Sequence, residues 1–567
     1  MKTEMQTPHP RPDFERQHWQ SLCGTWDFAF DSRPLGAWPM QITVPYCYQC
    51  KKSGIGETSY HACVWYRKYF TLSETELRHT ILLKFGAVDY ACCLYVNGIY
   101  VGVHEGGYTE FCFDITHFVV LGENEIVLSV QDDRDLSHPR GKQYWKDTPD
   151  RCWYTEVTGI WKSVWLEFTD MVYVKSIHCT PNIDDNSVRV DVELNDDFCG
   201  DAGFMVTYDG ETCAHVISRI QHENRFRVII SIPFADGVDE IHYWSPEHPN
   251  LYRLTITVGE DCVKTYFGMR SIEVRGDRIL LNHRPLYQRL ILDQGYWPDS
   301  LITPPDAQAL LTDLKLVKAM GFNGIRMHQK NEDPMFYFYA DELGLLVWLE
   351  MPSPYEFCAS EINSVVRDWS SMIAENYNHP SIITYVPFNE SWGIRKIAHD
   401  SQHQALANTL YWLTKSLDPT RLISSNDGWE FPSCTDLYGV HDYFGDTNTF
   451  SRHFADSDML YRIGIMRPLQ IHENPNLRCP ILLTEFGGIA FDRDLEGDAW
   501  GYNDAAESDT DYFECLKTQM DAIKGVPYLQ GYCYTQLTDV MQEANGLLKP
   551  DRTLKLPIEK LYELFGK

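Results

Sequence analysis

The chain has 567 residues, 44% of them hydrophobic and 13% aromatic, and a formal net charge of −31 at pH 7. This length favours three or four domains, and the strongly negative charge argues against nucleic acids and anionic membranes as partners. The charge suits a neutral small-molecule substrate, although a local group of Arg or Lys side chains could override it and bind an anion.

The seventeen cysteines are scattered without CxxC or zinc-ligand spacing, and the sequence contains no run of 18 apolar residues. Residues 1–6 are polar and lack the apolar core of a secretory leader. We therefore expect a cytoplasmic, reducing location, in which the cysteines act as small buried hydrophobic residues. No dedicated metal site and no cofactor are expected.

The first segment, residues 1–170, shows many short strand patterns separated by turns. Residues 24–31 alternate aromatic and polar side chains, as a half-buried strand does. Asn97 and Gly98 form a dipeptide that is typical of a hairpin turn. Further strands are expected at residues 66–70, 79–85, 91–96, 124–130 and 160–168. This pattern predicts a jelly-roll β-sandwich.

The second segment, residues 171–274, is again composed of strand patterns. Residues 188–194 alternate cleanly between apolar and polar side chains, and residues 226–232 and 254–258 continue the pattern. A segment of this length without paired cysteines predicts an immunoglobulin-like β-sandwich that lacks the usual disulfide.

In the third segment, residues 275–567, strand patterns alternate with helical patterns. Pro304, Pro305 and Asp306 precede the first helical pattern, as is common at a helix start. We expect strands at residues 286–292, 324–328, 345–350, 382–388, 421–425, 437–443, 481–485 and 528–534, and helices at residues 307–320, 334–343, 361–377, 402–417 and 509–523. Eight strands that alternate with helices predict a (β/α)8 barrel.

Two glutamates follow apolar strand patterns in this third segment. Residues 382–388 lead into Asn389 and Glu390, and residues 481–484 lead into Glu485. The carboxyl ends of parallel strands meet at one face of a barrel, where such folds place their chemistry. Two carboxyl groups there could act on one glycosidic bond, one as general acid and one as nucleophile. The sequence thus predicts a glycoside hydrolase.

Five short motifs spread along the chain support this prediction. They are residues 22–28, 159–167, 321–328, 388–390 (Phe-Asn-Glu) and 484–487 (Thr-Glu-Phe-Gly). Together they resemble glycoside hydrolase family 2, the family of β-galactosidases and β-glucuronidases, from end to end. The resemblance implies a sugar-binding jelly roll, an immunoglobulin-like domain and a catalytic barrel in this order.

By this resemblance, Glu485 is the nucleophile that forms a covalent glycosyl-enzyme, and Glu390 is the general acid and base. Their carboxyl groups are expected about 5–5.5 Å apart, the spacing of enzymes that retain the anomeric configuration. We expect burial and the charge of Glu485 to raise the pKa of Glu390.

Further residues are expected to hold the glutamates or to bind the sugar. Tyr443 stands where the family has a tyrosine that contacts the nucleophile, and Arg326 is a second expected partner of Glu485. Asn389 is expected to bind the sugar 2-hydroxyl. The other expected substrate contacts are the strand-end residues Asp293, His328 and His441 and the aromatic residues Trp392, Trp429 and Tyr534, the last where the family usually has a tryptophan.

The identity of the sugar depends on a motif that this chain lacks. Glucuronidases of the family bind the sugar carboxylate with an Asn-any-Lys motif in a late barrel loop, whereas residues 543–547 here are Glu-Ala-Asn-Gly-Leu. We therefore expect a β-galactosidase before a β-glucuronidase or β-galacturonidase. A uronidase needs a cation near C6 of the sugar, for which Lys330, Arg395 and Lys549 are the candidates.

The resemblance also implies exo action on the terminal β-linked sugar of a small glycoside or oligosaccharide, and a homo-oligomeric protein. Residues 140–145 are the candidate for a first-domain loop that closes the pocket. A catalytically silent carbohydrate-binding protein is the remaining alternative, which the intact Asn-Glu and Glu-Phe-Gly motifs disfavour.

Overall fold

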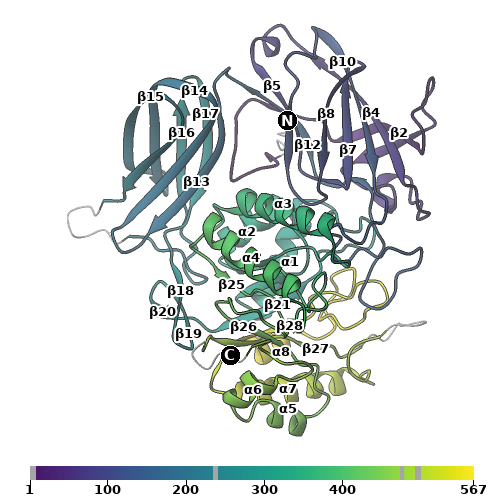
Figure 1. Cartoon of the computed structure of the whole chain (residues 1–567), viewed down its shortest axis with the longest axis vertical. Coiled ribbons are helices and arrows are strands. Elements are labelled where there is room, and N and C mark those ends of the chain that lie inside the picture. Colours follow the sequence, from purple (N-terminus) through teal and green to yellow (C-terminus); the bar gives the residue numbers. More distant parts are fainter. Residues whose placement is uncertain (1–7, 234–240, 473–477, 492–499, 567) are drawn as a thin grey trace.

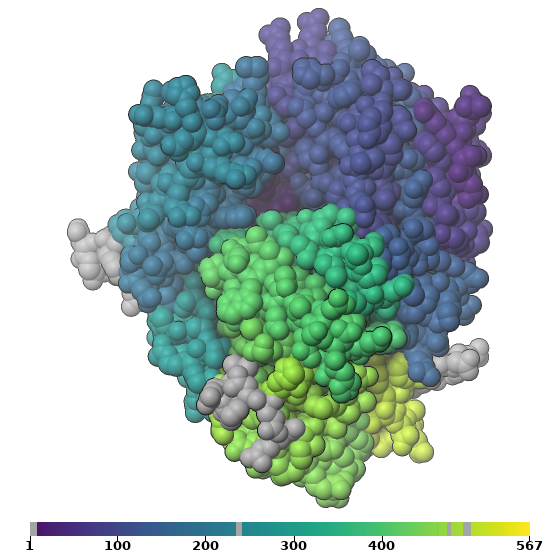
Figure 2. All heavy atoms as spheres, in the orientation of Figure 1, coloured from purple at the N-terminus to yellow at the C-terminus, as the bar shows by residue number. Residues whose placement is uncertain are grey.

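The computed structural model describes residues 8–233, 241–472, 478–491 and 500–566. Two β domains lie side by side on one side of a barrel domain (Figure 1). The space-filling view shows the purple-to-blue first domain and the teal second domain next to the green and yellow atoms of the barrel (Figure 2). This arrangement confirms the predicted fold class.

The first domain is a sandwich of two antiparallel sheets. Its core includes Trp26, Tyr66, Leu83 and Leu166, which are buried between the sheets. One sheet has the order β3 (Met40–Val44), β2 (Gly24–Phe30), β4 (Cys63–Leu72), β10 (Gly122–Gln131), β7 (Ala91–Val96) and β8 (Ile99–Glu105), and the other has the order β1 (Trp19–Ser21), β12 (Val164–Thr169), β5 (Thr80–Phe85) and β9 (Phe111–Asp114). A short pair, β6 (Val88–Asp89) and β11 (Gly159–Ile160), lies beside them. The turn at Asn97 and Gly98 joins β7 to β8 as predicted, and both residues have positive φ.

The second domain is built around two long antiparallel strands. The first half of β14 (Ser187–Tyr208) pairs with β13 (Val174–Asn182), its second half pairs with β16 (Tyr252–Val258), and β15 (Glu211–Ser231) pairs with β14 in both halves. The strand β17 (Asp261–Phe267) completes the sheet beside β16. The sequence indicated only residues 188–194 of β14, because residues 195–201 are mostly polar and exposed.

A small sheet closes the amino-terminal end of the barrel. It consists of β18 (Ile272–Arg275), β19 (Arg278–Leu281) and β20 (Arg284–Pro285). Ile279 and Leu281 belong to the same buried cluster as Leu290, Trp348 and Ile383, which point into the barrel. Apolar packing therefore fills this end, and the opposite end is left for polar residues.

The barrel has the eight predicted parallel strands. In ring order they are β25 (Leu422–Ile423), β24 (Ile382–Val386), β23 (Leu346–Glu350), β22 (Gly324–Met327), β21 (Gln288–Asp293), β28 (Leu529–Thr535), β27 (Ile481–Gly487) and β26 (Tyr438–His441). Between β25 and β26 the ring is joined by a bridge of Gly428 to Val440 and by a 2.9 Å hydrogen bond from Asp436 N to Ile423 O.

Helices surround these strands, and all five predicted helices are present within two residues of their expected bounds. They are α1 (Ala307–Ala319), α2 (Pro334–Leu343), α3 (Ala359–Asn376), α4 (Ser401–Leu417) and α7 (Asp509–Lys524). Three helices were not predicted: α5 (Thr447–His453), α6 (Ser457–Ile463) and α8 (Ile558–Phe565). Each has only seven or eight residues, too few for a clear helical period.

Candidate active site

The two predicted catalytic glutamates lie at the carboxyl ends of two strands that β25 and β26 separate in the ring. Glu485 is within β27, and Glu390 follows β24 by four residues. Glu390 has a φ of 52° and Ser391 a φ of 61°, conformations that residues other than glycine rarely adopt. Hydrogen bonds from Glu390 N to Asp427 O (2.9 Å) and from Ser391 N to Asn426 Oδ1 (2.9 Å) hold this turn.

Arg326 on β22 connects most of the polar groups at this end of the barrel. Its Nη1 lies 3.0 Å from Glu485 Oε1 and 3.1 Å from Asp427 Oδ2. Its Nη2 donates to Asn389 Oδ1 at 2.7 Å, and its Nε donates to Glu350 Oε2 at 2.9 Å. The guanidinium is fully buried, and although burial opposes its charge, the surrounding carboxylates raise the pKa of Arg326 above its usual value.

The Glu485 carboxylate is held through both of its oxygens. Oε1 accepts from Arg326, and Oε2 accepts from the Tyr443 hydroxyl at 2.6 Å. Tyr443 is itself fixed by stacking on Tyr502, with ring centroids 3.9 Å apart. Because both donors are fixed, the Glu485 carboxylate is held in a single orientation, as a nucleophile requires.

Glu390 has a different environment from the expected one. Its Oε1 lies 2.8 Å from Nδ1 of His441, and Nε2 of His441 lies 3.0 Å from Asp427 Oδ2. Burial opposes the charge of His441, but Glu485, Asp427 and Glu390 raise the pKa of the imidazole to about 10.

The predicted rise in the pKa of Glu390 is therefore wrong. Burial raises it, but the hydrogen bond and charge of His441 outweigh burial, so that the pKa of Glu390 is lowered. The sequence placed His441 at the site but did not show that it contacts Glu390.

One carboxylate oxygen of Glu390 and one of Glu485 lie within 4.8 Å of each other, together with a ring nitrogen of His441. Oxygens this close favour the roughly 5–5.5 Å between the carboxyl groups of retaining glycosidases over the roughly 6.5–9.5 Å of inverting ones. The same three groups could in geometry hold a cation, but a metal needs a neutral imidazole, and the raised pKa of His441 opposes that. The Glu390 side chain is 24% exposed and that of Glu485 is 6% exposed, so that solvent reaches Glu390 more readily.

His328 and Asn389 also lie at this site. His328 Nδ1 lies 3.1 Å from Glu350 Oε2, and burial, with the charges of Lys142 and Arg326, lowers the pKa of His328 well below its usual value. Burial raises the pKa of Glu350 to about 8 against the effect of Arg326. The Asn389 side chain is buried, and its Oδ1 accepts a hydrogen bond from Arg326.

Both predicted tryptophans border the glutamates. The Trp429 ring lies edge-on to His441 with centroids 5.6 Å apart. The Trp392 ring contacts Trp153 and Tyr355, with centroids 5.4 and 5.3 Å away. Trp392 thus belongs to an aromatic cluster beside Glu390 that joins the first domain to the barrel.

The structure contradicts the substrate contact predicted for Tyr534. Its ring packs outward against Phe486 and Phe565, and its hydroxyl lies 3.4 Å from that of Tyr512 on α7. Side chains alternate between the two faces of a strand, and Cys533 is the neighbour that points into the barrel. The sequence analysis assigned the inward-facing position to Tyr534, whereas Cys533, one residue earlier, occupies it.

The Asp293 backbone O accepts a 2.9 Å hydrogen bond from His328 N, but the structure gives the Asp293 side chain no hydrogen bond to the other predicted site residues. Its carboxylate accepts a 2.9 Å hydrogen bond from Gly295 N in its own loop, and its charge acts on Asp313 of α1. Leu292 is the residue of this strand end that packs inside the barrel. The binding of sugar hydroxyls by Asp293 stays a prediction.

The predicted first-domain loop reaches the mouth of the barrel. The backbone N–H groups of Arg140 and Gly141 both donate to Ser353 O at 3.1 Å, and the Tyr355 hydroxyl donates to Gly141 O at 2.5 Å. Farther along the same loop, the Tyr154 hydroxyl donates to Glu543 at 2.6 Å. In Figure 1 this blue segment descends on the right beside the yellow carboxy-terminal loops.

The three cations predicted to face C6 of a uronic acid have other surroundings. Lys330 forms an ion pair with Glu332 and donates to two carbonyl groups at 2.8 and 2.7 Å. Arg395 is exposed and lies 4.5 Å from the Trp392 ring centroid. Lys549 lies in a turn in which its N–H donates to Thr553 O at 2.8 Å. Besides Arg326 and His441, Lys142 is a cation whose charge acts on Glu390 and Glu485, and the sequence did not single it out.

Asp427 and Glu350 were also missed, although each follows or ends a predicted barrel strand. The argument that selected Glu390 applied to them too and could have found them. Among the described residues, no helix has the length and apolarity that a membrane span requires.

Three models of one family match consecutive parts of the chain. They are the sugar binding domain of glycosyl hydrolases family 2 at residues 37–169, a second family 2 domain at residues 172–270, and the family 2 TIM barrel domain at residues 272–493. The chain belongs to glycoside hydrolase family 2. Proteins similar to this chain include β-galactosidases, and similar structures include β-glucuronidases.

Among similar proteins is a β-galactosidase of Thermoanaerobacter pseudethanolicus, 27% identical over 60% of this chain and 45% of that protein. The chain spans less than half the length of such curated relatives. A β-glucuronidase structure from Ruminococcus gnavus has a TM-score of 0.79 at 19% identity and matches 97% of this chain and 98% of its own. A β-galacturonidase structure from Eisenbergiella tayi has a TM-score of 0.77 at 22% identity and matches 98% and 97%.

Proposed function

We propose that this protein is a retaining exo-β-glycosidase that removes a terminal β-linked sugar. The observation that carries the proposal is the pair of carboxylates within 4.8 Å of each other, with Arg326 and Tyr443 fixing one of them and solvent reaching the other. This spacing supports a double displacement, since inversion needs room for a water molecule between sugar and base.

In the first step, Glu485 attacks the anomeric carbon while Glu390 gives a proton to the leaving oxygen. In the second step, Glu390 takes a proton from water, which attacks the same carbon and releases Glu485. In this structure Glu390 lies 2.8 Å from His441, whose hydrogen bond and charge lower the pKa of the Glu390 carboxyl group. We infer that the bound sugar replaces this contact, because burial and the charge of Glu485 then raise the pKa of Glu390 as a general acid requires.

The sugar is either a galactose-type hexose or a uronic acid. The missing Asn-any-Lys motif supports a β-galactosidase, and a β-galactosidase is among the relatives. A β-glucuronidase or β-galacturonidase is the second candidate, because structures of both kinds share this fold and Lys142 brings a cation to the site. A cytoplasmic location and a homo-oligomeric state are further proposals from the composition and the family.

The test is hydrolysis of aryl β-glycosides by the wild type and by Glu485→Gly with azide. We expect proton NMR to show the β-anomer as first product of the wild type, and kcat of the variant to fall on the order of 10⁴-fold or more. Azide should restore turnover of the variant and give the α-glycosyl azide, because it replaces the missing nucleophile. Glu514→Gln, an exposed change on α7, is the control.

An α-anomer as first product would contradict retention. Full activity of Glu485→Gly would contradict the role of Glu485.

A further inference from the structure

Lys142 is a buried cation at the mouth of the barrel whose ammonium group has no direct partner in the part of the chain that the structure describes. The residue is 9% exposed, and no hydrogen bond or ion pair of its Nζ is present among residues 8–233, 241–472, 478–491 and 500–566. Its backbone is fixed by a 2.8 Å hydrogen bond from Tyr154 N to Lys142 O. Lysines this buried are almost always paired, whereas the ammonium group of Lys142 has no partner among the described residues and stays within reach of solvent.

The surroundings of Lys142 place it among the catalytic groups. Its charge acts on Glu390, Glu485 and His328, and on Glu543. The adjacent Gly141 is so close to the barrel that an added Cβ would lie 2.5 Å from Gln329 O, in the segment after β22. The loop therefore cannot move toward the barrel, and Lys142 stays where a bound sugar would meet it.

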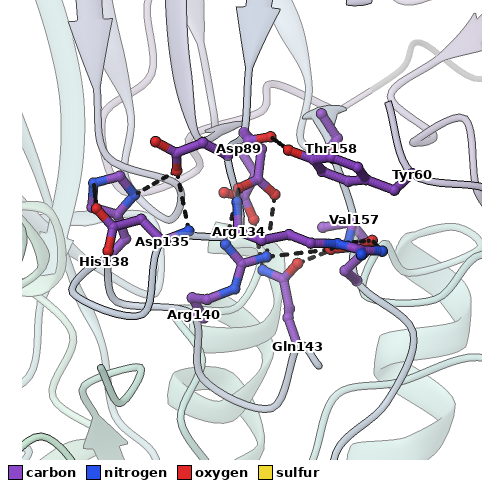
Figure 3. A network of polar contacts seen from close by, with 12 residues as sticks. Tyr60, Asp89, Arg134, Asp135, His138, Arg140, Gln143, Val157 and Thr158 are labelled. Carbon is purple, nitrogen blue, oxygen red and sulfur yellow. Dashed lines mark hydrogen bonds and ion pairs between the residues drawn. The ribbon is translucent and has the colours of Figure 1, made fainter. Parts of the chain in front are cut away.

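The base of this loop is held by a network of polar contacts in the first domain, which Figure 3 shows. Arg140 donates to Asp132 at 2.9 Å, and Arg134 donates to Glu156 at 2.9 Å. Gln143 Nε2 donates to Asp89 at 2.6 Å, and Gln143 Oε1 accepts from Val157 N at 2.7 Å. Arg140 and Gln143, on either side of Lys142, are thereby held in place. Ligand binding then requires little further ordering of this loop, so that its entropic cost is small.

Nothing in the barrel itself requires this cation. Arg326 and Tyr443 already donate to both oxygens of Glu485, and Glu543 accepts from Tyr154 and Asn545. Water can solvate an ammonium group that has no direct protein partner, and an anionic group on the ligand would replace that water as a charged partner. A neutral hexose offers only hydroxyl groups, whereas a uronic acid offers a carboxylate.

We propose that Lys142 is a specificity-determining residue whose ammonium binds the carboxylate of a terminal β-linked uronic acid. The inference rests on the proposed glycosidase function and names its substrate class. The cation comes from the first domain and not from a barrel loop, and it takes the place of the Asn-any-Lys motif that residues 543–547 lack. The galactoside expectation drawn from that missing motif is then replaced by a uronide.

The first test compares kcat/KM for aryl β-glucuronide, β-galacturonide and β-galactoside in the wild type, Lys142→Met and Lys142→Arg. We expect the wild type to prefer a uronide, and the ratio of uronide to galactoside kcat/KM to fall about 100-fold or more in Lys142→Met. Lys142→Arg should recover part of the ratio because it keeps the charge. Lys146→Met, an exposed change four residues away, is the matched control and should leave the ratio unchanged.

The second test needs no turnover. Calorimetric titration of Glu485→Gln with glucuronate, galacturonate and galactose should show that one uronate binds at least tenfold tighter than galactose, and that Lys142→Met abolishes the difference. The melting temperature of Lys142→Met should not fall, because methionine replaces an unpaired charge.

An equal loss on all three substrates would overturn the inference and assign Lys142 to support of the glutamates. A wild type that hydrolyses galactoside but not uronides would also overturn it, while the proposed glycosidase function stands. Absence of turnover with every substrate would count against the glycosidase function. The binding titrations would then be the only test of the role of Lys142.

Discussion

The two β domains contact opposite ends of the barrel. The first domain sends residues 140–154 to the carboxyl ends of the strands, where Tyr154 contacts Glu543 and Lys142 acts on both catalytic glutamates. From the second domain and the strand that follows it, Arg270 and Trp244 contact the other end, at Pro380 O and Asp341 O. Domains of the same structural class thus have separate effects, one on the chemistry and one on stability.

The largest effect should come from Arg270→Met, which tests whether the contact of the second domain with the barrel stabilises the protein. The buried guanidinium donates to Pro380 O, Ile382 O and Thr420 O at 3.0, 2.8 and 3.2 Å. Loss of three such bonds should lower the free energy of unfolding by about 4 kcal/mol, measured by denaturant titration, with kcat unchanged. Arg275→Met, whose side chain is 68% exposed, is the control. A fall in kcat at full stability would show that the second domain also acts on catalysis.

A smaller effect is expected where the two β domains meet. Arg16 lies 2.5 Å from Glu167 of the first domain and 3.0 Å from Asp261 of the second. Burial opposes the charge of Glu167, but Lys84 and Arg16 lower its pKa from 4.5 to about 2. The folded-state pKa lies below the unfolded value, so the stabilisation of about 3 kcal/mol is complete above pH 4.5 and is lost as the pH falls toward 2.

Denaturant titrations of the wild type and Glu167→Gln should therefore converge as the pH is lowered from 6 to about 3. A difference in unfolding free energy that stays constant over this range would contradict the ion pair as its source.

The smallest effect should come from Tyr154→Phe, which tests whether the loop of the first domain affects the reaction. Burial raises the pKa of Glu543, and the Tyr154 hydroxyl lowers it. Without the hydroxyl, Glu543 binds a proton more readily, which removes a negative charge close to the proposed catalytic groups. We expect kcat/KM to fall about tenfold, about 1.4 kcal/mol, in steady-state assays. Tyr100→Phe, an exposed change in the same domain, should have no effect. Unchanged kinetics of Tyr154→Phe would confine the loop to a structural role.

The barrel and its glutamates could be predicted because they depend on local patterns. The apolar residues before Glu390 and Glu485 define a buried strand, and a polar residue at the end of such a strand must lie at the mouth. Tyr534 shows the limit of this argument, because a shift of one residue along a strand moves a side chain to the opposite face. Sequence patterns located the strand β28 but not its inward-facing positions.

The contacts between domains could not be predicted from such patterns. Lys142 and Glu543 are about 400 residues apart in the sequence, and nothing near either residue indicates the other. The effect of His441 on Glu390 depends likewise on a 2.8 Å distance between residues from two strands. Charge balance at the site is a property of the folded chain, so the direction of the pKa shift of Glu390 was predicted incorrectly.

The anchoring of residues 140–154 in the first domain has a consequence for how this protein could diversify. The two glutamates that we propose as catalytic belong to the barrel, whereas Lys142 is inherited with a different domain and its own supporting network. Exchange of the first domain between two members of the family would then transfer sugar preference without any change in a catalytic strand. Recombination at the boundary of the first domain would be a route to new substrates that leaves the reaction itself intact.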